Sequence, residues 1–439
     1  MSRVIRLRLV FLLALVVPGS AVAQVPTYTK WTGSTALPKP QGNSNQGSPL
    51  TLTWGFMAPG TPINDSGSSG FANANNDLQT RLNTIYGSQA TWQPLFQSVF
   101  DRWSSVSGLS YQFEANDDGA AITGGTSSGF PTGVLGTRAD IRIGGKPLDG
   151  NSGTLAYNYF PSIGEMVIDT NDSFFADTSS GSIKLRNVVA HEHGHGIGMP
   201  HVTSSTNSFL MNPFYSGAFD GPQYHDILAA QYMYGDAREK SNGGLGNDTA
   251  ARANPLGTFG VGGSTSIGNS ARTISVAPTA TDFVSIDSQT DTDFYKFTLS
   301  EPATATVKLE ALGFTYNVGT QGGSSVTFDS KSRSNLKLAI LAADGTTLLA
   351  FADATGFGGD ETLVYNFGGA GDYYLRVTGE DNPDGVALVA QFYGLTLTLT
   401  PVPEPATVLV VAGVALGGGW LGRRVRRGGA AAPAGQSIL

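Results

Sequence analysis

The 439-residue sequence contains no cysteine, so no disulfide can brace the fold, and metals and packing must do so. Charged residues are scarce, at 14%, and the net charge of −8 comes without a basic stripe that could bind nucleic acid. Histidine is also scarce, with five in total, whereas glycine is abundant, with 58 residues. This composition is typical of a β-rich, loop-rich extracellular protein, and the length allows two or three domains.

Four of the five histidines lie in one run, His-Glu-His-Gly-His-Gly-Ile-Gly-Met-Pro-His, which starts at His191. His191 and His195 are four residues apart, so they project from one face of a helix. Gly198 lets the chain leave that helix, and His201 can then return as a third nitrogen ligand. Three His ligands with one open position are typical of a catalytic zinc site, and Glu192 can hold the attacking water there.

The remaining histidine of the run, His193, lies about 200° around the helix from His191. We therefore expect it to face away from the metal and not to bind it. Zinc on the other three would lower the pKa of the water, and Glu192 would take its proton as general base before passing it to the leaving amine.

The hydrophobic pattern around the motif predicts alternating strands and helices. Expected strands cover residues 50–56, 109–113, 139–143 and 164–169, an apolar helical stripe covers 91–107, and the zinc helix covers 183–196. This order predicts an α/β subdomain with a cleft under one edge strand.

Residues from about Leu50 to Gly235 resemble the matrixins, a branch of the metzincin zinc proteases, because the spacing H-E-x-x-H-x-x-G-x-x-H is the metzincin motif. Ser208–Pro213 is similar to the Met-turn of that family, which implies that Met211 forms the apolar floor beneath zinc. The matched Asp226 would support the Met-turn backbone.

The resemblance implies an α+β, zincin-like catalytic domain with a mixed sheet and a zinc helix, acting as a zinc metalloendopeptidase. For Met211 alone, the alternative is plain core packing. For the protein as a whole, one alternative is an inactive adhesion or matrix-binding protein built on a metzincin fold. The other is a zinc hydrolase that acts on non-peptide substrates.

The loop that starts at Asp149 resembles the calcium loop of the same family. Asp169 and Asp172 match the carboxylates that complete this site, which implies structural Ca²⁺. The alternative is that these aspartates merely shape turns.

The sequence departs from the matrixin pattern at several positions. A second, structural zinc site is not expected, because its ligand positions hold Arg142, Gly144, Tyr157 and Val167. His225 stands where the family has an Asp that pairs with the freed N-terminus, so activation through that salt bridge is not expected either.

Alternating apolar strands after residue 275 predict an antiparallel β-sandwich. Its Asp-Thr-Asp-Phe-Tyr run at 291–295, its Asp344-Gly345 hairpin signal and the run 371–377 resemble the bacterial pre-peptidase C-terminal domain. The resemblance implies binding to substrate or matrix, with calcium at Asp291 and Asp293. The alternative is a stable spacer.

Both ends of the chain carry sorting signals. Basic residues near the start, the apolar run Val10–Val17 and the Ala21-Val22-Ala23 cleavage site predict a signal peptide. Pro403-Glu404-Pro405, the apolar stretch 406–421 and the arginines after it resemble the PEP-CTERM signal of Gram-negative bacteria. That resemblance implies an exosortase as partner, transient membrane contact through a short transmembrane helix, and delivery to the cell surface or extracellular matrix. A plain C-terminal anchor is the alternative.

The expected layout has six parts. They are a signal peptide at 1–23, a linker at 24–48, the matrixin-like domain at 49–236, a linker at 237–275, the β-sandwich at 276–400 and the sorting tail at 401–439.

Overall fold

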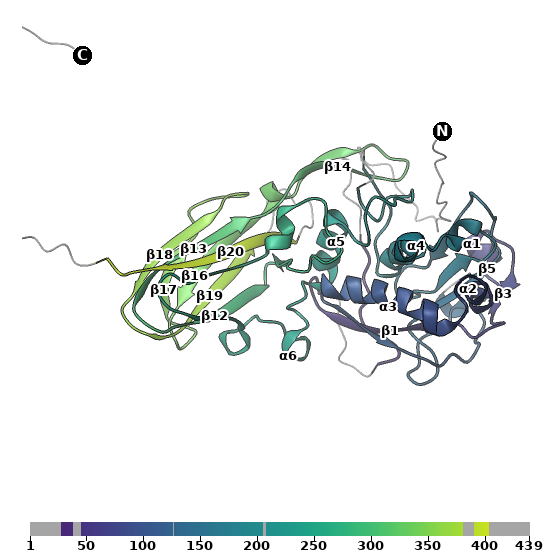
Figure 1. Cartoon of the computed structure of the whole chain (residues 1–439), viewed down its shortest axis with the longest axis horizontal. Helices are drawn as coiled ribbons and strands as arrows, with labels where there is room; N and C mark the ends of the chain where they lie inside the picture. Colours follow the sequence, from purple (N-terminus) through teal and green to yellow (C-terminus); the bar gives the residue numbers. More distant parts are fainter. Residues whose placement is uncertain (1–27, 38–44, 126, 205–207, 381–389, 404–439) are drawn as a thin grey trace, which may run out of the picture. The chain divides into compact units, whose positions relative to one another are not determined.

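The computed structural model describes residues 28–37, 45–125, 127–204, 208–380 and 390–403 (Figure 1). The expected signal peptide and nearly all of the sorting tail lie outside the described residues. The described residues up to Val402 belong to one compact unit. In the described part of the chain, no helix has the length and apolar character that a membrane crossing needs.

The first region is built on a five-stranded mixed sheet. Its order is β4 (Leu109–Phe113), β1 (Leu50–Phe56), β5 (Ile141–Lys146), β7 (Met166–Asp169) and β6 (Ala156–Asn158). Strand β6 pairs antiparallel with β7, whereas β1 pairs in parallel with β4 and β5, and β5 in parallel with β7. The side chains of Leu52 and Trp54 in β1 are fully buried.

Helices pack against this sheet (Figure 1). They are α2 (Leu78–Tyr86), α3 (Gln89–Ser105) and α4 (Ser179–Gly196), and a further helix, α5 (Tyr224–Tyr234), follows them in the chain. The apolar stripe of α3 meets the sheet where Phe100 stacks on Trp54, with ring centroids 4.4 Å apart. The same stripe of α3 also holds α4, because Trp103 Nε1 donates to the Ala190 carbonyl at 3.2 Å. The sheet and α3 thus fix α4, the helix that carries the histidine motif.

Short elements complete the first region. They are β2 (Pro62–Ile63), α1 (Ser66–Ser69), β3 (Ala74–Asn75), β8 (Val202–Thr203), α6 (Ser241–Gly244) and 3₁₀ turns at Ser127–Gly129, Ser173–Ala176 and Ala250–Arg252.

Part of the segment 24–48, expected to be a linker, packs on this region. Trp31 is only 1% exposed and lies in the main hydrophobic core. Its indole Nε1 donates to the Gly196 carbonyl at 2.7 Å, and its backbone N–H donates to Tyr234 Oη at 3.0 Å. The described part of the segment therefore joins the end of α4 to α5.

The second region is a sandwich of two sheets. One sheet has the order β10 (Ser264–Ile267), β20 (Gln391–Thr400), β13 (Ala303–Ala311) and β18 (Glu361–Phe367), with β11 (Ser285–Ile286) also on β20. The other has the order β17 (Leu348–Ala352), β16 (Asn335–Leu341), β19 (Gly371–Glu380), β12 (Thr292–Leu299) and β9 (Asn254–Phe259). Further 3₁₀ turns lie at Asn269–Arg272 and Lys331–Arg333.

Most pairs in the sandwich are antiparallel, as expected, but β9 runs parallel to β12. Strands β9 and β10 both come from residues 237–275, which the sequence predicted to be a linker.

A hairpin leaves the sandwich between β13 and β16. It consists of β14 (Thr315–Thr320) and β15 (Val326–Asp329), and β14 pairs antiparallel with β8 of the first region. Val318 and Phe328 of this hairpin are buried in the same core cluster as Trp31. Residues of both regions therefore contribute to this cluster, while the sandwich also has a separate core cluster of its own.

Candidate metal centre

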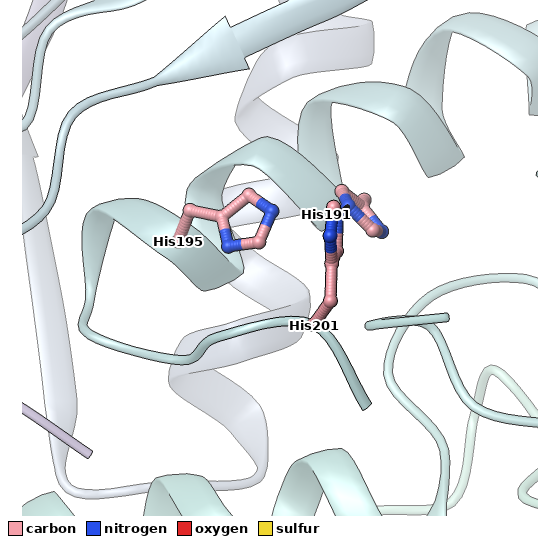
Figure 2. Close-up of side chains that lie close together, drawn as sticks. All are labelled: His191, His195 and His201. Atoms are coloured by element: carbon pink, nitrogen blue, oxygen red, sulfur yellow. Dashed lines mark hydrogen bonds between the residues drawn. The ribbon is translucent and has the colours of Figure 1, made fainter. Parts of the chain in front are cut away.

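Three histidines converge at the end of α4. His191 and His195 project from the helix, and His201 comes from the chain that turns back after it (Figure 2). One nitrogen from each ring lies within 4.8 Å of the others, and the Nε2 atoms of His191 and His201 are 3.1 Å apart. All three side chains that the sequence predicted as zinc ligands are therefore brought together.

Glycine makes the turn between the helix and His201 possible. Gly198 has φ 111°, which L side chains rarely adopt, and a Cβ there would lie 1.4 Å from the Thr29 carbonyl oxygen. The amide of Thr29 donates to the Gly198 carbonyl at 3.2 Å. The packed N-terminal segment thus requires glycine at this position.

Each of the three imidazoles donates its Nδ1–H to a fixed acceptor. The acceptor of His191 is the Leu210 carbonyl and that of His195 is the Met199 carbonyl, both at 2.6 Å. His201 donates to the side chain of Gln321, also at 2.6 Å. With Nδ1 protonated, each Nε2 carries a free lone pair, which is the form that binds a metal.

Burial keeps these rings neutral. It lowers the pKa of His191 to about 3, with a further contribution from His201, and lowers that of His201 to about 4. Burial also holds the pKa of His195 well below its ordinary value. The Nε2 atom of His195 is buried without a hydrogen-bond partner among the described residues. Neutral, oriented rings with an orphaned lone pair fit a bound zinc ion.

Glu192 lies beside the first ligand and is fully buried. Neither of its carboxylate oxygens has a hydrogen-bond partner in the described part of the chain, and burial raises its pKa to about 8. An orphaned carboxylate of this kind is costly unless a cation or a water stabilises it. Its environment therefore also fits a metal and a water nearby.

His193, expected not to bind metal, is engaged on a different side of α4. Its Nε2 lies 2.6 Å from Tyr111 Oη, and its ring packs against Phe100 with centroids 4.7 Å apart. The ligand cluster does not include it.

The structure also places Met211 and Asp226, the residues predicted to form and support the Met-turn, close to α4 and to each other. A Cβ on Gly194 would be 2.2 Å from the Met211 sulfur, so that side chain lies directly against the histidine-bearing turn of α4. The Asp226 carboxylate accepts the backbone N–H groups of Leu210 and Met211, at 2.7 and 3.1 Å. It also accepts the Gln223 N–H at 2.8 Å and so caps α5.

Comparison with known families agrees with this geometry. Residues 76–235 match the matrixin family, and residues 291–379 match the bacterial pre-peptidase C-terminal domain. The chain joins a matrixin domain to a bacterial pre-peptidase C-terminal domain. As predicted from the sequence, the fold is α+β, with a mixed sheet and a zinc helix followed by a β-sandwich.

Curated relatives match the matrixin domain at moderate identity. The hatching enzyme of Paracentrotus lividus is 32% identical over 166 residues, which are 35% of this chain and 23% of that protein. Metalloendoproteinase 2-MMP of Arabidopsis thaliana is 30% identical over 152 residues, 32% of this chain and 36% of that protein. Karilysin of Tannerella forsythia is 34% identical over 112 residues, 22% of this chain and 23% of that protein. This chain thus spans well under half the length of each.

For the second domain, a solved structure of the pre-peptidase C-terminal domain of a collagenase from Bacillus anthracis was found. It is 13% identical and covers 34% of this chain and 96% of that one, with a TM-score of 0.19.

A small apolar cavity adjoins the metal centre of the matrixin domain. It measures about 10 Å³, and its lining residues are Asn187, Val188, His191, Leu210, Tyr215, Ser216 and Phe219. This is space for roughly one water molecule. It lies next to His191, between α4 and the segment from Leu210 to Phe219.

Each of the three aspartates predicted to bind calcium accepts a backbone N–H, but Oδ2 of Asp172 is buried without a hydrogen-bond partner among the described residues. Asp169 accepts the N–H groups of Leu148 and Gly150, at 3.0 and 2.9 Å. Asp149 accepts from Thr154 and Asp172 accepts from Phe174. These carboxylates are not among the groups whose ligand atoms cluster within 4.8 Å in the described residues. Calcium at this loop stays a prediction.

Two of the positions that could have held a second zinc take part in buried polar contacts. Arg142 Nε lies 2.6 Å from an Asp117 carboxylate oxygen, and Tyr157 Oη donates to Asp65 at 2.6 Å. Asp65 also receives the ammonium of the buried Lys146, at 2.6 Å. Protein cations and hydroxyls therefore satisfy these carboxylates.

A second group of close ligand atoms lies at the junction with the sandwich. One carboxylate oxygen each from Glu239, Asp248 and Asp291 lies within 4.8 Å of the others, beside a cavity of about 390 Å³. Asp293, the other predicted calcium ligand, is fully buried and accepts a hydrogen bond from Tyr393.

Sequence reasoning missed two contributors to the metal centre. Trp31 fixes the end of α4, and Gln321 holds the third ligand. For Trp31, the presence of a tryptophan in an otherwise polar segment could have indicated that this segment packs on the fold. Nothing in the local sequence around Gln321 pointed to a histidine 120 residues away.

Proposed function

We propose that this protein is a secreted, zinc-dependent metalloendopeptidase. The observation that supports it most strongly is the convergence of the neutral rings of His191, His195 and His201 beside the orphaned carboxylate of Glu192. The matrixin match and the named relatives, among them metalloendoproteinase 2-MMP, point to the same chemistry.

In the proposed mechanism the three imidazoles would hold zinc through their Nε2 atoms. Bound zinc would supply Lewis-acid activation of a water and of the peptide carbonyl. Glu192 would take the proton from the water and pass it to the leaving amine. The buried surroundings of Glu192 would exclude bulk water from this transfer, and Met211 would keep the floor of the site apolar.

The substrate is proposed to be protein or peptide, placed beside His191. The cavity next to that ligand would receive the side chain that follows the cut bond. With a volume of about 10 Å³ and walls that include Leu210 and Tyr215, it favours a small apolar side chain.

Export and sorting are proposed from the chain ends. The signal peptide would send the protein out of the cytoplasm, and an exosortase would act near Pro403-Glu404-Pro405. Residues 24–400 would then work at the surface, or in the extracellular matrix, of a Gram-negative bacterium. The likeness to karilysin of Tannerella forsythia supports this proposal.

The test is casein or gelatin cleavage by the purified protein, with and without a zinc chelator. Glu192→Gln should retain zinc and lose activity by roughly three orders of magnitude or more, because it removes the general base and leaves the ligands intact. Retained cleavage in that variant would overturn the assignment of Glu192. A wild type that binds zinc and cleaves no peptide in a mixed library would favour the inactive, matrix-binding alternative.

A further inference from the structure

The groups that accept the Nδ1–H of the three histidines differ in kind and in the domain that supplies them. His191 and His195 donate to carbonyls of the matrixin domain's own backbone, from Leu210 and Met199. His201 donates instead to a side chain, Gln321, which belongs to the β14–β15 hairpin of the second domain. Of the three acceptors, this is the one that a single substitution can remove.

Backbone pairing places Gln321 at this position. In the register of β14 with β8, Thr320 lies opposite Val202 and Gly319 opposite Thr203. The residue after Thr320 therefore meets the residue before Val202, which is His201. Val202 N–H also donates to the Met211 carbonyl at 2.9 Å, so one strand ties the third ligand, the Met-turn and the hairpin together.

The base of the hairpin is anchored in the matrixin core. Tyr316 Oη lies 3.0 Å from Nδ1 of His225, and the Tyr316 ring packs edge-on against Phe209, with centroids 5.2 Å apart. Phe328 is 2% exposed and contacts both Tyr316 and His225. These contacts anchor the base of the hairpin, and Gln321 takes no part in them.

We propose that Gln321 is a positioning residue for the metal centre, so that the second domain completes the zinc site of the first. By accepting the Nδ1–H of His201, it fixes the tautomer and the ring orientation that present Nε2 to zinc. The inference rests on the proposed zinc site and adds to it a dependence on the appended domain. The side chain of Gln321 is itself exposed, so water can partly replace it as the acceptor. We therefore expect the loss of zinc affinity on removing it to lie at the low end of the range known for such contacts to metal-binding histidines.

The test is the zinc affinity of the full chain, measured by competition with a chromophoric chelator. Gln321→Ala should weaken zinc binding by about tenfold. Gln321→Glu keeps an acceptor oxygen and should restore affinity to within about twofold of wild type. Ser324→Ala changes another exposed side chain of the same hairpin tip and should behave as wild type.

Thermal unfolding of the zinc-free proteins separates positioning from general support. Because the anchoring lies in Tyr316 and Phe328, the zinc-free Gln321→Ala protein should unfold at the wild-type temperature. If it unfolds earlier, recovery of zinc affinity by Gln321→Glu still identifies the acceptor as the cause.

Two outcomes would overturn the inference. One is wild-type zinc affinity in Gln321→Ala, and the other is a Gln321→Glu protein that binds zinc as weakly as Gln321→Ala. Failure of the wild type itself to bind zinc is a different result, because it would refute the proposed function.

Discussion

At the scale of single residues, the histidine run divides into three proposed ligands and one packing residue. His191, His195 and His201 have their Nδ1 atoms held and their Nε2 atoms converging. His193 shares the same helix but bonds to Tyr111 and packs on Phe100. Helix geometry alone predicted this division, because a two-residue step turns the side chain to the far face.

The division gives a prediction for a matched pair of variants. His195→Ala should abolish zinc binding, whereas His193→Ala should keep one zinc per chain. The second change leaves the buried Tyr111 hydroxyl without its partner, so it should lower the free energy of unfolding by about 1–3 kcal/mol. Elemental analysis and urea unfolding of both proteins check this. Zinc loss in His193→Ala with its fold intact would contradict the assignment.

At the scale of elements, the sequence predicted most of the scaffold near the motif. The expected strands 50–56 and 109–113 match β1 and β4. The zinc helix, expected at 183–196, is regular from Ile183 on, because the three residues before it have left-handed φ. Strong periodicity and a fixed motif determine these elements locally. The pairing of β14 with β8 depends on tertiary contacts and could not be predicted this way.

The link between α5 and the Met-turn is an element-scale contact that can be tested. Asp226→Ala leaves the N–H groups of Leu210, Met211 and Gln223 without their acceptor. Their loss should lower the free energy of unfolding by about 3 kcal/mol or more. Asp220→Ala is the control, because its pair with Arg186 is partly exposed and should contribute less than about 1 kcal/mol. Equal losses in the two variants would contradict the role of Asp226.

At the scale of the whole molecule, the two domains meet around buried carboxyl groups. Burial, reinforced by neighbouring carboxylates, raises the pKa of Glu239 to about 11 and holds those of Asp287, Asp291 and Asp293 well above their ordinary values. The folded protein therefore keeps protons that the unfolded chain releases above about pH 4. Stability from these groups is full below that pH and is lost as the pH rises towards their folded pKa values.

A bound cation would remove this pH dependence. In a calcium chelator, the free energy of unfolding should fall between pH 5 and pH 8, and millimolar Ca²⁺ should reverse the fall if calcium binds at Asp291 and Asp293. Asp291→Asn should weaken both the pH dependence and the calcium effect. Asp101→Asn, at an exposed site on α3, should leave both unchanged. A pH dependence that is the same with and without Ca²⁺ would refute calcium binding at the junction.

An anomalous difference map at the zinc absorption edge, from a crystal of the zinc-loaded full chain, would locate the metal. We expect a single strong peak bonded to the Nε2 atoms of His191, His195 and His201. The absence of a peak at these rings, or a peak that His201 does not reach, would contradict the proposed zinc site.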